Sequence, residues 1–209
     1  MARLKEYNGH YCESEYEYAF IGFLEAEGWK YSSGNNIHRV TKRDVLIADD
    51  FKKFIADTNL DLTEDEVIQI YDNVRLVGAE SDFATLHKVY GWMVNGVQFT
   101  PQDGLPRMIP LIEFDNWDKN IFRVVNQFTV EYTNNGQKEN RRPDVLLFVN
   151  GMPLCVIELK NPADANATIY DAWEQINIRY WRDIPHLLHY CPLACISDGV
   201  KTRLGTVRT

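Results

Sequence analysis

The chain lacks the features that mark membrane proteins, zinc modules and nucleotide-driven motors. It has 209 residues and no run of 18 apolar residues, so we expect no transmembrane helix. Its four cysteines show no metal-ligand spacing. Cys191 and Cys195 lead into an apolar segment, which favours buried free thiols. No G-x-x-x-x-G-K-[ST] phosphate loop is present, so we expect no ATP hydrolysis by these residues.

Positive charge is also scarce. The 22 Lys and Arg residues face 30 Asp and Glu residues, giving a net charge of −8, so tight DNA binding by the chain alone is not expected. The start of the sequence is polar and carries no secretory signal, which predicts a cytoplasmic protein without a membrane partner. The 45% apolar content and the length fit a single domain, 1–209.

The most informative segment is a predicted hairpin at residues 144–160. Residues 145–149 form a continuous β-prone apolar run, Asn150-Gly151 is a strong hairpin signal, and residues 154–157 begin a second buried strand. Alternation along that strand puts Glu158 and Lys160 on one face, roughly 6.7 Å apart. The hairpin returns Asp144 to the same end, so the sequence predicts that two acids and an ammonium group converge there.

Two close carboxylates at a buried strand end repel each other and are costly to desolvate, whereas a divalent cation resolves both problems. We expect Asp144 and Glu158 to bind Mg²⁺, or Mn²⁺ in its place, with the backbone carbonyl of Leu159 as a third ligand. Lys160 would orient or help deprotonate the attacking water and offset transition-state charge. The alternative interpretation is a structural ion pair between Glu158 and Lys160.

Asp144, Glu158 and Lys160 match the PD-(D/E)xK nuclease signature. The wider sequence resembles the N-terminal region of the type I restriction enzyme R subunit, from about Glu13 to the C-terminus and least clearly over residues 32–100. The segments that carry the resemblance are 114–116, 124–130, 142–145, 148–151, 156–162 and 196–199. It implies an α/β fold with a restriction-endonuclease-like core, a mixed central sheet flanked by helices, and a helical elaboration at 32–100.

The resemblance also implies a function. In that family an N-terminal endonuclease domain is joined to an ATP-driven DNA translocase and to a region that binds the methyltransferase and specificity subunits. We therefore expect a nuclease domain without its motor that hydrolyses double-stranded DNA with Mg²⁺ and needs ATP only for the absent motor. The alternatives are a free-standing nuclease of the repair or modification-dependent type, and a non-catalytic DNA-binding or assembly module.

Accessory residues are expected on a helix at 167–182. The family has Q-x-x-x-Y there, but in this chain Gln175 and Tyr180 are five residues apart, which turns them to different faces of a regular helix. Either a one-residue bulge restores the geometry or Arg179 replaces the tyrosine. The alternative is a surface glutamine and a packing tyrosine. Arg142, directly before the Pro143-Asp144 pair, is a further predicted DNA contact.

A helix is also expected at 14–27, where Ser14 and Glu17 read as a capping box. Nucleases of this class often place an early helical glutamate beside the metal, and the matching residue is Glu15. Its alternative role is an interaction with the helix dipole. The remaining predictions are helices at 44–59 and 63–77, strands at 86–94, 96–99, 108–114, 122–132 and 193–196, and a polar turn or mobile loop at 133–140.

Overall fold

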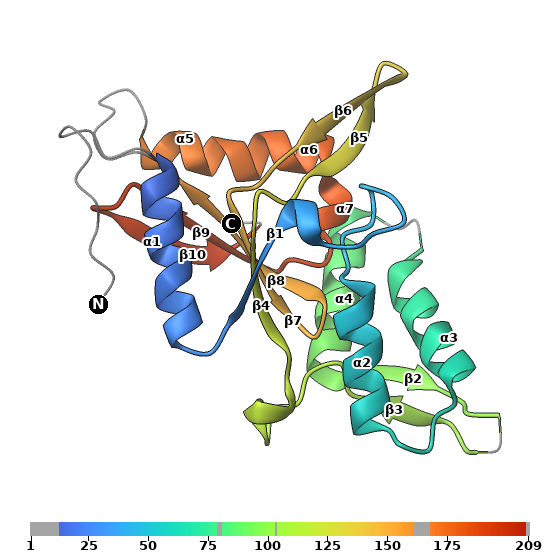
Figure 1. The fold of residues 1–209 in the computed structure, drawn as a ribbon. Coiled ribbons are helices and arrows are strands. Elements are labelled where there is room, and N and C mark those ends of the chain that lie inside the picture. Colours follow the sequence, from blue (N-terminus) through green and yellow to red (C-terminus); the bar gives the residue numbers. More distant parts are fainter. Residues whose placement is uncertain (1–12, 79–80, 103, 161–167, 208–209) are drawn as a thin grey trace.

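The protein, described from a computed structural model, folds around one six-stranded mixed sheet (Figure 1). The structure describes residues 13–78, 81–102, 104–160 and 168–207. The strand order is β1-β4-β7-β8-β9-β10. The bounds are Lys30–Ser33, Phe122–Asn126, Val145–Val149, Met152–Leu159, Leu193–Ser197 and Thr202–Thr206. The predicted α/β class with a mixed central sheet is confirmed.

The hairpin β7–β8 lies in the middle of this sheet. β7 is antiparallel to β4 and β8, while β8 runs parallel to β9. Asn150 and Gly151 form the turn with φ values of 49° and 77°, as the sequence predicts. The Asn150 side chain accepts a hydrogen bond from the Ile121 amide and donates to the Leu111 carbonyl, which fixes the turn from inside. A Cβ atom on Gly151 would collide with the Ile47 carbonyl, so the turn requires glycine.

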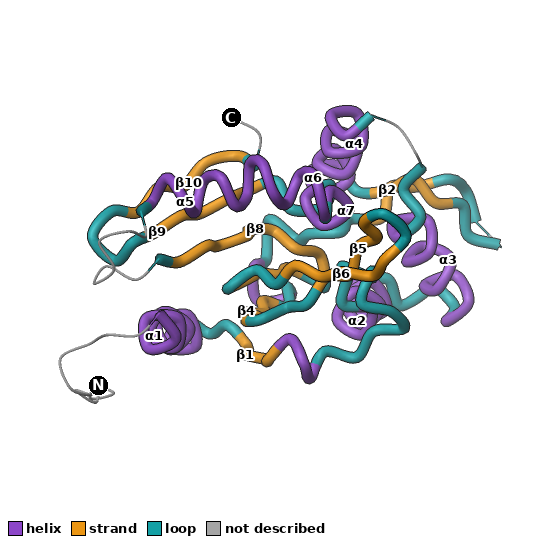
Figure 2. The backbone as a smooth tube through the Cα atoms, turned by 90° about the horizontal axis from the view of Figure 1, so that it is seen from above, coloured by secondary structure: helices purple, strands orange, loops and turns teal. Residues whose placement is uncertain are grey.

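Helices cover both faces of the sheet (Figure 2). α1 (Glu13–Ala26) packs Ile21 against Val124, Val145 and Ile157 on one face. The opposite face is covered by α5 (Ile169–Glu174), a π-helical segment (Gln175–Tyr180), α6 (Trp181–Asp183) and α7 (Pro185–Leu188). Because β-strand side chains alternate between faces, Val145 and Leu146 point to different cores. This layering places α1 and α5 on either side of the end of β8.

Residues 32–100 contain a 3₁₀ turn (Gly34–Asn36) and the helices α2 (Ala48–Thr58), α3 (Glu64–Arg75) and α4 (Asp82–Asn95). The predicted capping box of Thr63 and Glu66 is present. The predicted helix at 44–59 begins only at Ala48. The predicted strand at 86–94 is wrong, because these residues lie in α4. Gly96 follows α4 with φ 82°, so the Asn95-Gly96 pair ends a helix instead of turning a hairpin.

Two further strand predictions need correction. Residues 122–132 do not form one strand, since Gln127 adopts φ 54° and separates β4 from β5 (Val130–Asn134). Of the two predictions for residues 133–140, the polar turn is present at Asn135-Gly136, whereas the mobile loop is wrong, because β5 pairs with β6 (Gln137–Arg141) there. Polar residues form this ribbon because it extends away from the sheet core (Figure 1).

The last differences concern short elements. The strand expected at 108–114 is limited to β3 (Arg107–Ile109), which pairs with β2 (Val97–Phe99) in a separate two-stranded sheet. A 3₁₀ turn at Trp117–Lys119 precedes β4. The predicted strand at 193–196 is confirmed as β9. Within the ranges described, no helix combines the length and apolarity needed to cross a membrane.

Candidate active site

Glu158 is the centre of the candidate site. It lies near the end of β8 with no exposed surface. The Tyr180 hydroxyl donates to its Oε1 at 2.6 Å, and the Gln175 amide donates to its Oε2 at 2.6 Å. A buried carboxylate is tolerated only when such donors satisfy it. Both donors come from the helical layer over the sheet, so that layer fixes the direction of the carboxylate.

Asp144 lies directly beside Glu158. Its Oδ2 accepts a hydrogen bond of 2.8 Å from the backbone amide of Leu159, and its carboxyl group lies within hydrogen-bonding reach of Glu158. Burial, and then the Asp144 charge, raise the pKa of Glu158 well above its ordinary value. The structure therefore brings the two predicted acids together at the strand end.

Lys160 completes the cluster through Gln175. Its Nζ donates to Gln175 Oε1 at 3.2 Å, and its backbone amide donates to the Ser197 carbonyl of β9. The Lys160 charge counteracts part of the rise in the Glu158 pKa. Gln175 therefore accepts from Lys160 and donates to Glu158 through opposite ends of one amide group.

The spacing of Gln175 and Tyr180 is explained by the π-helical segment between them. A π-helix closes i to i+5 hydrogen bonds, so residues five apart return to the same side. Gln175 Nε2 donates to the Tyr180 hydroxyl at 2.9 Å, and both side chains reach Glu158. The bulge considered from sequence is present. Tyr180 faces the acids, whereas Arg179 is exposed and lines a neighbouring cavity.

This bulge gives a testable prediction for deletion of Ile178, which is exposed. Removing one residue from a π turn converts it to a regular α turn without moving its two ends. The variant is therefore expected to keep the melting temperature and the tyrosine near Glu158. Melting temperature and a crystal structure of the variant are the measurements.

The matched control is deletion of Asn73 from the regular helix α3. It rotates the fully buried Val74 by about 100° out of the core and should cost roughly 2–5 kcal/mol in the free energy of unfolding. Equal destabilisation by the two deletions would contradict the bulge interpretation.

On α1, the structure brings Glu17 to the site. Glu17 is 5% exposed and accepts hydrogen bonds from Asn126 at 2.6 Å and Gln127 at 2.8 Å. Burial raises the pKa of Glu17, the hydrogen bonds from Asn126 and Gln127 lower it in part, and the charge of Asp144 adds to the rise. The Gln127 backbone amide donates to the Asp144 carbonyl while its side chain donates to Glu17, so Gln127 links the two acids. Glu15, the residue predicted from sequence, is partly buried on the same helix.

The predicted capping box explains why Glu17 was missed. Its S-x-x-E pattern gave Glu17 a local role at the helix start. In the structure α1 already includes Glu13, so Ser14 lies inside the helix, and the Glu17 carboxylate reaches the end of β4 instead. The sequence did contain one indication of this role. Glu17 lies one helical turn before the apolar Ile21, on the face of α1 that packs against the sheet, so its side chain points towards the protein interior.

The oxygen atoms of Asp144 and Glu158 suit Mg²⁺, which binds through one or two carboxylates plus water and phosphate oxygens. The desolvated Glu158 beside a second acid is the observation that fits such an ion. Across the described ranges, no group of three or more His, Cys, Asp and Glu side chains is arranged to hold a metal. A cation here would therefore depend on two carboxylates and on backbone or solvent oxygens, as the predicted Leu159 carbonyl would supply.

A mixed α/β sheet that presents two acids and a lysine at one strand end defines a candidate site for metal-assisted hydrolysis. Residues 11–209 match the family described as type I restriction enzyme R protein N terminus, and the chain belongs to this family.

Two relatives cover most of the chain. It is 34% identical over 200 residues to a putative type I restriction enzyme MjaIXP endonuclease subunit of Methanocaldococcus jannaschii, covering 91% of this chain and 19% of the relative. It is 30% identical over 209 residues to the type I restriction enzyme HindI endonuclease subunit of Haemophilus influenzae, covering 93% and 19%. The chain thus spans about a fifth of the length of these relatives.

Proposed function

We propose that the chain is the endonuclease domain of a type I restriction enzyme R subunit, with a PD-(D/E)xK active site that hydrolyses DNA phosphodiester bonds with Mg²⁺. The observation that carries this proposal is the hydrogen-bonded cluster of Asp144, Glu158, Lys160, Gln175 and Tyr180 at the end of β8. The names of the relatives, all endonuclease subunits, support the same assignment.

In this proposal Asp144 and Glu158 hold the cation through their oxygen atoms. When bound, the ion would polarise the phosphate and acidify a water molecule. Gln175 and Tyr180 orient Glu158, because each donates one hydrogen bond to a different oxygen of its carboxylate. Lys160, held by Gln175 Oε1, supplies a positive charge that orients the attacking water and stabilises charge on the phosphate.

The substrate we propose is double-stranded DNA, and the partners are the methyltransferase and specificity subunits of the same enzyme. ATP would serve only a motor region elsewhere in the full-length subunit. The family match and the names of both relatives favour this assignment over a free-standing repair nuclease. The cluster of acids and lysine favours it over a non-catalytic module.

Metal removal tests the proposal. DNA cleavage by the full-length protein is expected to stop in EDTA and to return with Mg²⁺ or Mn²⁺, because two adjacent carboxylates need a cation to act on a phosphate. Cleavage is followed on duplex DNA by gel electrophoresis, with calcium as a control for binding without efficient hydrolysis. Cleavage that continues at the full rate in EDTA would refute the metal-dependent mechanism.

A further inference from the structure

A cavity of about 440 Å³ adjoins the candidate active site. Its lining residues come from the end of β6 and from the π-helical segment: Asn140, Arg141, Arg142, Gln175, Arg179 and Tyr180. Gln175 and Tyr180 are also the donors to Glu158, so one wall of the cavity is shared with the acid cluster. An anion in this cavity would therefore lie next to a phosphate bound at Asp144 and Glu158.

The charge of the cavity is opposite to that of the chain. Among the residues that the structure describes, three arginines and no carboxylate line it, although the net charge of the protein is −8. Arg142 and Arg179 are exposed, and neither forms an ion pair with another residue that the structure describes. Because Arg141 is paired with Asp183, the charges that an anion would offset are those of Arg142 and Arg179, and an anion bound between them would lower their mutual repulsion. Phosphate is the anion whose geometry their paired N–H donors match.

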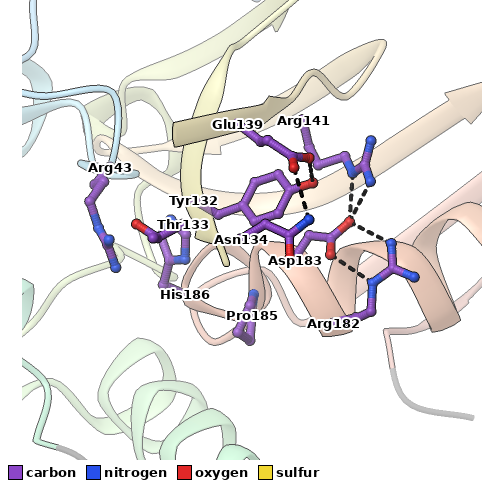
Figure 3. Close-up of a pocket in the computed structure, with 10 residues that line it drawn as sticks. All are labelled: Arg43, Tyr132, Thr133, Asn134, Glu139, Arg141, Arg182, Asp183, Pro185 and His186. Carbon is purple, nitrogen blue, oxygen red and sulfur yellow. Dashed lines mark hydrogen bonds and ion pairs between the residues drawn. The ribbon is translucent and has the colours of Figure 1, made fainter. Parts of the chain in front are cut away.

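Arg141 is held in place by Asp183. Its guanidinium group donates to Asp183 at 2.7 Å and 2.6 Å, and Arg182 binds the same carboxylate from the other side, as Figure 3 shows. Arg182, and then Arg141, hold the pKa of Asp183 below its usual value, despite the opposing effect of burial. Asp183 thus fixes the direction of Arg141 while its own charge is offset by two arginines.

Arg141 also lines a second cavity, of about 550 Å³, between the β5–β6 ribbon and α6–α7 (Figure 3). This cavity carries Arg43 and Arg182 in addition, together with the carboxylates of Glu139 and Asp183, of which Asp183 is paired with Arg141 and Arg182. The two cavities therefore share one fixed arginine, and the guanidinium groups of Arg182 and Arg43 follow it towards the ribbon. A free phosphate would need only one such cavity, whereas a nucleic-acid strand carries a phosphate at each nucleotide.

We propose that the cavity formed by Arg141, Arg142 and Arg179 binds a backbone phosphate of DNA next to the phosphate that is hydrolysed, and that the strand continues past Arg141 towards the second cavity. This inference rests on the proposed nuclease function. Asp183 acts as a positioning residue for Arg141.

The test is DNA binding by the full-length protein carrying Arg142→Gln, Arg179→Gln or both. Binding of a fluorescent duplex is measured by anisotropy in EDTA at several salt concentrations, so hydrolysis does not contribute. Each substitution is expected to weaken binding about tenfold, as lost charged hydrogen bonds do. It should also reduce the slope of log K against log salt by about one, the value for one phosphate contact.

The matched control is Lys53→Gln, which removes one positive charge from an exposed ion pair on α2 and should change neither quantity. Unchanged affinity and slope in the double variant would overturn the inference. Loss of inorganic phosphate binding in calorimetry with unchanged DNA affinity would also overturn it, because the site would then serve free phosphate.

Asp144→Asn separates this inference from the proposed function. It should abolish cleavage while keeping the salt slope of the unmodified protein. If Asp144→Asn still cuts DNA while the arginine variants lose binding, the nuclease assignment fails and the phosphate site stands. If Asp144→Asn loses cleavage and the arginine variants bind normally, the phosphate site fails alone.

Discussion

Replacement of Asp144, Glu158 or Lys160 is expected to abolish DNA cleavage by the full-length protein. Asp144→Asn and Glu158→Gln each remove a charge that would hold the proposed cation, and Lys160→Ala removes the ammonium group that donates a hydrogen bond to Gln175. Loss of one group that stabilises transition-state charge costs about 10²–10³-fold in rate, and loss of the cation costs more. Cleavage and ATPase activity should be measured on the same preparation.

These variants are expected to stay folded. Burial, and then the Asp144 charge, raise the pKa of Glu158, so removing either carboxylate charge should leave the melting temperature unchanged or slightly higher. ATP-driven translocation should also persist, because under the proposed function the motor region lies outside these residues. A variant that cuts duplex DNA with Mg²⁺ at the normal rate would exclude this site from the mechanism. Loss of both activities in a stable variant would mean that motor and nuclease are coupled.

Tyr180→Phe is expected to reduce metal affinity about 10–100-fold, the usual effect of removing a group that orients a metal ligand. The Tyr180 hydroxyl donates to Glu158 Oε1 and accepts from Gln175, so its loss leaves the carboxylate free to rotate away from Asp144. The Mg²⁺ concentration that gives half-maximal cleavage should rise accordingly. Excess Mg²⁺ should restore most of the rate, because no group that contacts the phosphate has been removed.

Tyr190→Phe is the matched control. The Tyr190 side chain is 4% exposed, and its hydroxyl donates to the carbonyls of Val74 and Arg75 in the helical part of the protein. Its loss should reduce the free energy of unfolding by about 1 kcal/mol and leave the Mg²⁺ dependence unchanged. If Tyr180→Phe and Tyr190→Phe have the same Mg²⁺ dependence, Tyr180 has only a packing role.

The central hairpin was predictable because its signals are local. An apolar run, an Asn-Gly turn and a second apolar run fix two adjacent strands, and the two-residue period of a strand then fixes which side chains share a face. That period is enough to bring Asp144 and Glu158 to one strand end. The helix after β8 was also predictable from the sequence. The five-residue spacing of Gln175 and Tyr180 left two possibilities, a bulge in that helix or replacement of the tyrosine by Arg179.

The errors occurred where one local pattern serves two structures. Asn95-Gly96 predicts a hairpin turn, but it ends α4, because a glycine at positive φ suits both positions. Residues 122–132 were predicted as one strand, and residues 133–140 as a polar turn or loop. The first strand ends at Gln127 because this residue adopts a positive φ value, which the sequence does not indicate since no glycine stands there.

The sequence alone determined the acid–lysine hairpin and its family, because these follow from neighbours in the chain. Only the tertiary structure decided that Gln127 links Glu17 to Asp144, that the π turn brings Tyr180 to Glu158, and that three arginines line one cavity. These contacts join residues from separate elements, and their geometry depends on how α1 and the α5–α7 layer pack against the sheet. Packing of that kind is a property of the whole core and leaves no periodic signal in any one segment.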